Sequence, residues 1–327
     1  MKLVFLDGHA LNPGDLPAPY DGYALFQEFG EVTVYDRTPP GLTAERIGDA
    51  EAIFTNKVRL DAELLADCPN LRYIGVMATG YNTIDVAYAA AHGITVTNIP
   101  DYSTDAVAQH VFALLLALTN RAAEHDRSVK AGEWAACPDF CYFTHPLTEL
   151  SGKTMGIIGY GHIGRRVAEI ARAFGMRVLV HSRTERAGEP VRFVGLDELL
   201  AESDVVSLHC PLFPETRGLI GQTALARMKH SSILINTARG PIVDEAALAD
   251  ALRRRQIAGA GVDVLSREPA KPDNPLLSAP HCLITPHIAW GASETRIRLL
   301  EIAADNLRQY LNHSPVHVVQ PPVEINK

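Results

Sequence analysis

The chain has 327 residues, of which 47% are hydrophobic and 21% charged. At about 150 residues per domain, this length suggests two domains or one large α/β unit, and the composition excludes disordered and fibrous proteins. The 30 basic and 38 acidic residues give a net charge of -8, so we expect neither a nucleic-acid nor an anionic-membrane partner, because those surfaces attract basic proteins.

We expect no targeting segment and no membrane span. The start of the chain holds only a short apolar run, which is interrupted by Asp7, and it lacks a small-residue cleavage site. The longest apolar run, 111–118, is far below the ~20 residues of a membrane span. We therefore predict that this run is a buried helix.

The five cysteines are odd in number and scattered along the chain. This usage suits a reducing compartment, so we expect a cytoplasmic protein. Cys137, Cys141 and His145 match no common zinc spacing and have no evident fourth ligand. We therefore expect no bound metal.

Short apolar runs alternate with helical patterns along the chain, which predicts an α/β protein with parallel sheets. The first predicted strands are 3–6, 32–35, 52–54, 73–76 and 94–97, with a helix at 84–92. The later strands are 155–158, 178–180, 205–208, 233–235, 261–264 and 283–285, with a helix at 163–174. Two doubly wound domains follow from this pattern, and six parallel strands in the second suit a Rossmann-type dinucleotide-binding domain.

Two proline-containing segments, 98–104 and 286–293, are candidate crossings between the domains. In the first, Ser103 or Thr104 is placed to cap a helix at 105–120. The second precedes a helix at 294–311 that has no sheet partner nearby in sequence. We therefore expect a dinucleotide-binding domain, 100–289, inserted in a flavodoxin-like substrate domain, 1–99 plus 290–327.

The strongest motif is GYGHIG at residues 159–164, between a predicted strand and a predicted helix. The first glycine permits a tight turn, the second lets the backbone approach a pyrophosphate, and the third allows close helix–strand packing. The helix N-terminus adds unpaired N–H donors and a positive dipole. The expected cofactor contacts in this motif are Gly159, Gly161, His162, Ile163 and Gly164.

The end of the next predicted strand bears on the choice between NAD and NADP. An NAD enzyme places Asp or Glu there to bind the ribose hydroxyls, but this chain has Ser182 and Arg183. Arg183 can pair with a 2′-phosphate and Ser182 can donate a hydrogen bond to it. We therefore expect NADP or NAD, with NADP favoured, although Arg183 could instead be an ordinary surface residue.

Polar residues follow several predicted strands at the edge where such sheets bind ligands. Arg239, Glu268 and His287 are the residues there that carry chemistry. Each has another explanation when taken singly: Arg239 could pair with Asp244, Glu268 could be a solvated loop charge, and a lone histidine is usually structural. Their convergence beside a nicotinamide favours a shared catalytic role.

These three residues suit hydride transfer between a nicotinamide and a carbonyl. Negative charge builds on the carbonyl oxygen as hydride arrives, and His287 can neutralise it by donating a proton. Glu268 can hold the histidine tautomer and favour its charged form, while Arg239 can clamp a substrate carboxylate through its planar fork. Together they predict a 2-keto acid reductase, or in reverse a 2-hydroxy acid dehydrogenase.

The sequence resembles the D-isomer-specific 2-hydroxyacid dehydrogenases over nearly the whole chain. The matching motifs are GYGHIG at 159–164, HCPL at 209–212, INTARG at 235–240, DVLSREP at 263–269 and TPHIAW at 285–290. The resemblance implies the same roles for Arg239, Glu268 and His287. It also implies an active site in an interdomain cleft, and a homodimer formed through the nucleotide-binding domains.

The resemblance adds further site residues. It implies that the backbone amides of Thr79 and Gly80 hold the substrate carboxylate, and that Asp263 faces the nicotinamide carboxamide. The other implied cofactor contacts are Thr104, His209, Cys210, Pro211, Thr237, Ala238 and Ala289. Trp290 could wall the substrate pocket or equally belong to the core.

Within this family, segments 78–82, 98–100 and 286–290 are most similar to glycerate dehydrogenases, also called hydroxypyruvate or glyoxylate reductases. The first hypothesis is therefore an enzyme that reduces a small 2-keto acid, hydroxypyruvate or glyoxylate. One alternative is a dinucleotide-sensing, corepressor-like binding protein, because fold alone does not fix function. The other alternative is a 3-phosphoglycerate dehydrogenase.

Overall fold

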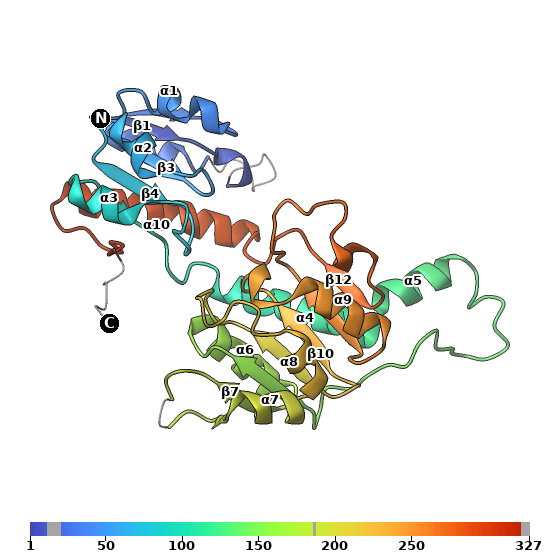
Figure 1. Cartoon of the computed structure of the whole chain (residues 1–327). Helices are drawn as coiled ribbons and strands as arrows, with labels where there is room; N and C mark the ends of the chain where they lie inside the picture. Colours follow the sequence, from blue (N-terminus) through green and yellow to red (C-terminus); the bar gives the residue numbers. More distant parts are fainter. Residues whose placement is uncertain (12–20, 186–187, 322–327) are drawn as a thin grey trace. The chain divides into compact units, whose positions relative to one another are not determined.

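The computed structural model describes residues 1–11, 21–185 and 188–321, and the chain divides into two compact units (Figure 1). Unit 1 contains Met1–Tyr102 and Gly291–Lys327, and unit 2 contains Ser103–Trp290. The chain thus crosses between units at 102–103 and 290–291, where the sequence analysis placed the crossings at 99–100 and 289–290. Because unit 2 interrupts unit 1, unit 1 is built from two separate segments.

Unit 1 contains a five-stranded parallel sheet in the order β2-β1-β3-β4-β5. Its strands are β1 (Lys2–Phe5), β2 (Glu31–Val34), β3 (Ala52–Thr55), β4 (Tyr73–Val76) and β5 (Thr95–Thr97). Its helices are α1 (Thr43–Ile47), α2 (Ala62–Ala66), α3 (Val86–Ala91) and α10 (Ser293–Leu311), with 3-10 turns at Gly8–Ala10, Ala24–Phe29 and Pro40–Leu42. This strand order confirms the predicted flavodoxin-like topology.

The core of unit 1 is formed by aromatic rings packed on its sheet and by strands that are buried on both faces. On one side of the sheet, Phe5 stacks on Phe54 at 4.6 Å between ring centroids, and Phe26 meets both rings edge-on at 4.8 Å. Every residue of β3 and β4 is buried, as expected for strands covered on both faces. After α10, residues 317–319 return to β5, where the Val319 N–H donates to the Val96 carbonyl at 2.8 Å.

Unit 2 contains a seven-stranded parallel sheet in the order β12-β11-β10-β9-β6-β7-β8. Its strands are β6 (Thr154–Ile158), β7 (Arg177–His181), β8 (Arg192–Phe193), β9 (Val205–Leu208), β10 (Ile233–Asn236), β11 (Gly259–Val262) and β12 (Cys282–Ile284). The strand order reverses at β6, because β7 and β8 lie on one side of it and β9 to β12 on the other, as in the Rossmann fold. The predicted fold class is therefore confirmed. The expectation of six strands was wrong, because β8 is only two residues long and leaves no periodic pattern.

Apart from α5, the described helices of unit 2 cover both faces of this sheet. They are α4 (Thr104–Asn120), α5 (Ala122–Lys130), α6 (His162–Ala173), α7 (Leu196–Glu202), α8 (Gln222–Arg227) and α9 (Glu245–Arg253), with 3-10 turns at Gly240–Ile242 and Pro275–Ser278. Helices α4 and α6 share one core cluster, and α7, α8 and α9 share the other. Of the two predicted caps, Ser103 takes the N-cap position of α4 and Thr104 is the first helical residue, but the Ser103 side chain makes no capping hydrogen bond.

Strand β11 lies two residues earlier than predicted. It runs from Gly259 to Val262 rather than over 261–264, so Asp263 follows the strand instead of lying inside it. The two glycines lack the β-branched signal of a strand, but they allow α4 to pack closely. A Cβ added at Gly261 would lie 3.0 Å from the Leu114 side chain.

Helix α5 and the segment after it form an arm, residues 121–148, that extends away from the sheet of unit 2 (Figure 1). No residue of α5 is buried. Within residues 1–11, 21–185 and 188–321, no single helix is long and apolar enough to cross a membrane. Helices α4 and α5 pass that test of length and composition only as a pair bent by 52°.

Candidate active site

The glycine motif forms a tight loop between β6 and α6. At Gly159, where φ is +96°, a Cβ would lie 2.5 Å from the Cys210 backbone nitrogen. At Gly164 a Cβ would lie 2.2 Å from the Gly159 carbonyl oxygen, whereas a Cβ at Gly161 would meet nothing within 4 Å. The outer two glycines therefore permit packing inside the protein, and the middle one leaves open space at the start of α6.

This loop fits a dinucleotide. In the part of the chain that the structure describes, the backbone N–H groups of Gly161 and Ile163 donate to no protein acceptor, so they remain available to a pyrophosphate. After β10, the buried hydroxyl of Thr237 has no hydrogen-bond partner among the described residues. A buried hydroxyl without a partner is costly, and a ligand at the carboxyl edge of the sheet would supply one.

The residues after β9 form the opposite wall of the glycine loop. Burial lowers the pKa of His209 to about 3, so its ring is neutral at physiological pH, and its Nε2 lies 2.8 Å from Ser207 Oγ. Burial also raises the pKa of the neighbouring Cys210 thiol, which keeps it protonated and unreactive. The carbonyl of Pro211 accepts a hydrogen bond from Thr216 at 2.8 Å, which closes the turn that follows.

Ser182 and Arg183 follow β7, the neighbour of β6. The Arg183 guanidinium carbon lies 5.1 Å from the centroid of the Phe213 ring, which is a cation–π distance. Nearby, the Tyr160 hydroxyl donates to Glu189 at 3.1 Å and so links the glycine loop to the segment that follows β7. The arginine is exposed, so its donors can reach a ligand.

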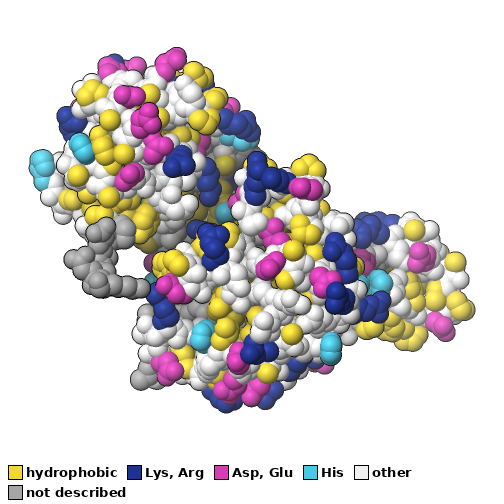
Figure 2. Space-filling view, in the orientation of Figure 1, with side chains coloured by type: hydrophobic (Ala, Val, Ile, Leu, Met, Phe, Trp, Pro, Cys, Tyr) yellow, Lys and Arg dark blue, Asp and Glu magenta, His cyan; other side chains and the backbone are white. Residues whose placement is uncertain are grey.

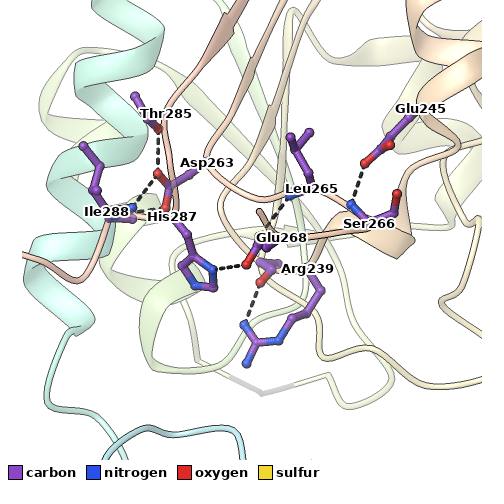
Figure 3. A network of polar contacts seen from close by, with 11 residues as sticks. Arg239, Glu245, Asp263, Leu265, Ser266, Glu268, Thr285, His287 and Ile288 are labelled. Atoms are coloured by element: carbon purple, nitrogen blue, oxygen red, sulfur yellow. Dashed lines mark hydrogen bonds and ion pairs between the residues drawn. The ribbon is translucent and has the colours of Figure 1, made fainter. Parts of the chain in front are cut away.

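His287 and Glu268 form the closest charged contact of the site (Figure 3). His287 Nδ1 lies 2.6 Å from Glu268 Oε2, and the other carboxylate oxygen accepts the Leu265 N–H at 3.0 Å. With Nδ1 directed at the carboxylate, Nε2 is the nitrogen left for a substrate. His287 has φ of +56°, an unfavourable conformation for a side chain of its size, and such strain is often found at functional sites.

Asp263 anchors the loop that carries His287 (Figure 3). Its carboxylate is 1% exposed, and it accepts the N–H groups of Ile288 and Ala289, both at 2.9 Å, and the Thr285 hydroxyl at 2.6 Å. Burial raises the pKa of Asp263, but the hydrogen bonds, with that from His110 foremost, outweigh burial and hold it below its usual value. Asp263 is therefore ionised, and its carboxylate is engaged by the loop of His287 and by His110.

Arg239 lies beside His287 and Glu268 at the same edge of the sheet (Figure 3). Its guanidinium is exposed and donates to the Ala238 carbonyl at 2.7 Å. The alternative pairing with Asp244 is not present, because that carboxylate caps α9 through the Ala246 and Ala247 N–H groups. The Arg239 fork is thus free to meet a carboxylate ligand.

The remaining expected residues lie in both units. In unit 1, the backbone N–H groups of Thr79 and Gly80, just beyond β4, donate to no acceptor among the described residues, while the Thr79 hydroxyl donates to the Ile99 carbonyl at 3.0 Å. Two adjacent unpaired N–H groups suit a carboxylate ligand. In unit 2, Thr104 begins α4, and Trp290 is partly buried at the last position of the unit.

Comparison with known proteins decides the family. The family model described as "D-isomer specific 2-hydroxyacid dehydrogenase, NAD binding domain" matches residues 112–289. A hydroxypyruvate reductase of Blautia hydrogenotrophica is 48% identical, over 98% of this chain and 99% of the relative. A glycerate dehydrogenase of Methylorubrum extorquens is 40% identical over the same shares. The chain belongs to the D-isomer-specific 2-hydroxyacid dehydrogenase family.

Solved structures agree with this assignment. An NADPH-dependent glyoxylate/hydroxypyruvate reductase from Sinorhizobium meliloti, in complex with NADP and malonate, superimposes with a TM-score of 0.82 at 29% identity, over 97% of this chain and 96% of that one. The chain is therefore an NAD(P)-dependent oxidoreductase acting on small 2-keto or 2-hydroxy acids. Its cofactor is a nicotinamide dinucleotide.

One part of this dehydrogenase's site was missed by sequence reasoning. His110 lies on α4, and its Nε2 is 2.9 Å from the Thr285 hydroxyl and 3.5 Å from Asp263. It connects α4 to the loop of His287 across 175 positions in sequence. The only signal in sequence was a polar pair, Gln109-His110, immediately before an apolar run.

Proposed function

We propose that this dehydrogenase reduces hydroxypyruvate and glyoxylate to the corresponding 2-hydroxy acids. The observation that carries the proposal is the 2.6 Å contact between His287 and Glu268, with the exposed fork of Arg239 beside it (Figure 3). The proposed catalytic residues are Arg239, Glu268 and His287. Hydroxypyruvate is named for the relative at 48% identity, and both acids are named for the Sinorhizobium meliloti enzyme.

Each of the three side chains contributes one step. The bound dinucleotide supplies the hydride to the carbonyl carbon. His287, protonated and held by Glu268 through Nδ1, donates its Nε2 proton to the carbonyl oxygen as charge builds there. Arg239 binds the substrate carboxylate bidentately and stabilises the charge on the adjacent oxygen. In the oxidative direction the same imidazole accepts the proton.

The backbone donors of unit 1 complete the proposed substrate contacts. The N–H groups of Thr79 and Gly80, which have no acceptor among the described residues, would hold the substrate carboxylate. The rest of the proposed cofactor contacts are the glycine motif 159–164, residues 209–211, Thr104, Thr237, Ala238, Asp263 and Ala289. For Asp263 the four hydrogen-bond donors around its carboxylate favour an indirect role, in which it positions the loop of His287.

We further propose that the preferred cofactor is NADP. Ser182 stands where a carboxylate would repel a 2′-phosphate, and Arg183 presents an exposed guanidinium that lies over the Phe213 ring. An arginine fork pairs with a phosphate through two parallel hydrogen bonds. Its exposed position at the end of β7 is the one at which Rossmann-type domains bind the adenosine ribose.

A homodimer is the proposed assembly. The arm exposes large aromatic side chains: Trp134 is 51% exposed, Phe143 69% and Phe140 89%. Figure 2 shows hydrophobic side chains gathered over this arm at the right of the view. Exposed apolar clusters of this kind mark protein–protein contacts, and a second copy of the chain would bury them.

We also propose a cytoplasmic location. All five cysteines are free thiols, and a reducing compartment maintains that state. Fusion of the chain to a fluorescent protein, followed by fractionation and imaging, would test the location directly. Recovery in an oxidising compartment with disulfides formed would contradict it.

The test of function is an absorbance assay of NADPH and NADH oxidation. Purified protein receives hydroxypyruvate, glyoxylate or a bulkier 2-keto acid with each cofactor. The proposal expects fast turnover of both small acids, slower turnover of the bulky one, and a preference for NADPH. Cofactor binding without turnover of any acid would instead favour a dinucleotide-sensing protein, and a preference for NADH would overturn the cofactor proposal alone.

A further inference from the structure

A cavity of about 490 Å³ lies in unit 1, outside the carboxyl ends of β1, β2 and β3. All the residues that line it belong to unit 1, and none of them has a part in the proposed reaction. The chain leaves β1 for β2 on one side and then returns to β3 on the other, so the strand order reverses between β1 and β3. Open α/β sheets bind ligands at such a reversal, outside the carboxyl ends of the strands.

The two carboxylates that line the cavity are already used by the protein. Asp7, just after β1, accepts the backbone N–H groups of Asn56 and Lys57 at 2.8 and 2.6 Å and so ties two loops together. Asp61 caps α2 by accepting the Leu64 N–H at 3.2 Å. These hydrogen bonds hold both carboxylates in place, and the three basic residues of the lining outnumber them.

Three basic side chains line the cavity from two loops. Arg37 follows β2, and Lys57 and Arg59 follow β3. In the described ranges the guanidinium of Arg37 makes no hydrogen bond or ion pair, although its carbonyl is held by the Arg46 side chain. Among the residues that the structure describes, Arg59 has only a loose ion pair, 3.7 Å from Asp61. Among the described residues, the guanidinium groups of Arg37 and Arg59 are therefore held loosely or not at all.

We propose that this cavity binds a small phosphate monoester of mononucleotide size. Arg37, Lys57 and Arg59 would contact the phosphate, whose two negative charges match several cations better than a monocarboxylate does. Pro40, Val58 and Leu64, which also line the cavity, would contact the organic part. A volume of about 490 Å³ lies within the usual range of small-molecule sites.

The test uses the full-length protein saturated with NADPH, so that the dinucleotide site is filled. Isothermal titration calorimetry with uridine 5′-monophosphate should show one saturable site, and uridine should bind at least about tenfold more weakly. Arg37→Ala combined with Arg59→Ala should weaken binding of the nucleotide by about tenfold or more and leave the kinetics of hydroxypyruvate reduction unchanged. Arg254→Ala, an exposed change in unit 2, is the matched control and should bind like the wild type.

Three outcomes would overturn the proposal. They are no saturable binding of uridine 5′-monophosphate up to about 10 mM, equal affinity in the double variant, and binding that occurs only when NADPH is left out. If the double variant does not fold, Arg37→Ala alone gives the same test, because that guanidinium has no partner in the described part of the chain. Calorimetry measures nucleotide binding and does not depend on reductase activity. A wild-type protein without reductase activity would contradict the proposed function and leave this proposal standing.

Discussion

The contact between Glu268 and His287 allows a direct test of the proposed proton donor. Glu268→Gln keeps an oxygen for the Leu265 N–H but removes the charge that favours the imidazolium form. We expect kcat for hydroxypyruvate to fall about 10²-fold, because a neutral amide at Nδ1 stabilises the proton-donating imidazole less well than a carboxylate does. His287→Ala should lose about 10²–10⁴-fold with NADPH affinity unchanged.

A matched control is Glu245, the first residue of α9, which bonds to the loop that carries Glu268. Glu245 accepts the Ser266 N–H at 2.5 Å without a contact to His287 (Figure 3), so Glu245→Gln should change kcat little. Steady-state kinetics over a range of pH measure all three variants. A loss in Glu268→Gln no larger than that in Glu245→Gln would contradict the role of the Glu268 charge.

Ser182 determines how the adenosine end of the cofactor is recognised, if the NADP proposal is correct. Ser182→Asp places a carboxylate where the 2′-phosphate would lie, so repulsion should lower kcat/KM for NADPH by about 10²-fold. The kcat/KM for NADH should stay level or rise, because the carboxylate can accept the ribose hydroxyls. Equal losses with both cofactors would mean that Ser182 does not discriminate between them.

Asp263 gives a prediction for acid stability. Hydrogen bonds hold its folded pKa below the unfolded value, so the ionised carboxylate stabilises unit 2 fully above the unfolded pKa, about 3.9. This stabilisation is lost as the pH falls below that value and through the folded pKa. Asp263→Asn should lower the free energy of unfolding by about 1–3 kcal/mol at neutral pH. The gap from the wild type should shrink in acid, as urea unfolding followed by circular dichroism can measure.

At the scale of single residues, the sequence placed Arg239, Glu268 and His287 correctly at one sheet edge, because each follows a strand and strand ends converge. The set of hydrogen-bond donors around the Asp263 carboxylate was not predictable in the same way. His110 reaches Thr285 from α4, and such a contact depends on how a helix packs on the sheet. Periodicity shows which face of a helix is apolar, but it does not show which polar side chain meets a distant loop.

The glycine loop makes separable predictions for stability and binding. Gly159→Ala and Gly164→Ala should both destabilise unit 2, because their Cβ atoms would lie within 2.5 Å of backbone atoms. The Cβ of Gly161→Ala meets nothing within 4 Å. Its free energy of unfolding without cofactor, measured by thermal denaturation, should therefore match that of the wild type within about 1 kcal/mol. NADPH affinity of Gly161→Ala should still fall, since the methyl group enters the space left for the pyrophosphate. Unchanged affinity would place the cofactor elsewhere.

Among the elements, long strands with apolar runs were predictable and short or glycine-rich ones were not. Strands β4 and β9 match their predicted bounds, because Tyr73–Val76 and Val205–Leu208 are continuous buried runs. Strand β8 was missed, and β11 was displaced, because Gly259 and Gly261 carry no side chain to give a periodic signal. Strand β11 is defined instead by its packing against α4.

At the scale of the whole molecule, the exposed aromatic residues of the arm lead to a prediction about the proposed homodimer. Phe140→Ser with Phe143→Ser should shift a dimer toward monomer in sedimentation or light scattering, because burial of each phenyl ring stabilises an interface by about 1.5–3 kcal/mol. Leu277→Ser is the control, since Leu277 is 50% exposed outside the arm. A wild-type protein that is monomeric at micromolar concentration, or a double variant that stays dimeric, would contradict the arm as the contact.

The interruption of unit 1 by unit 2 has a consequence for biosynthesis. Residues 317–319, which bond to the edge of β5 through the Val96 carbonyl and the Asn98 N–H, leave the ribosome only after all of unit 2. A nascent chain that has reached residue 290 therefore holds every strand of both sheets, but α10 and the partner of β5 are still to come. Unit 2 can reach its final fold during translation, while unit 1 must wait with an open strand edge and an uncovered sheet face.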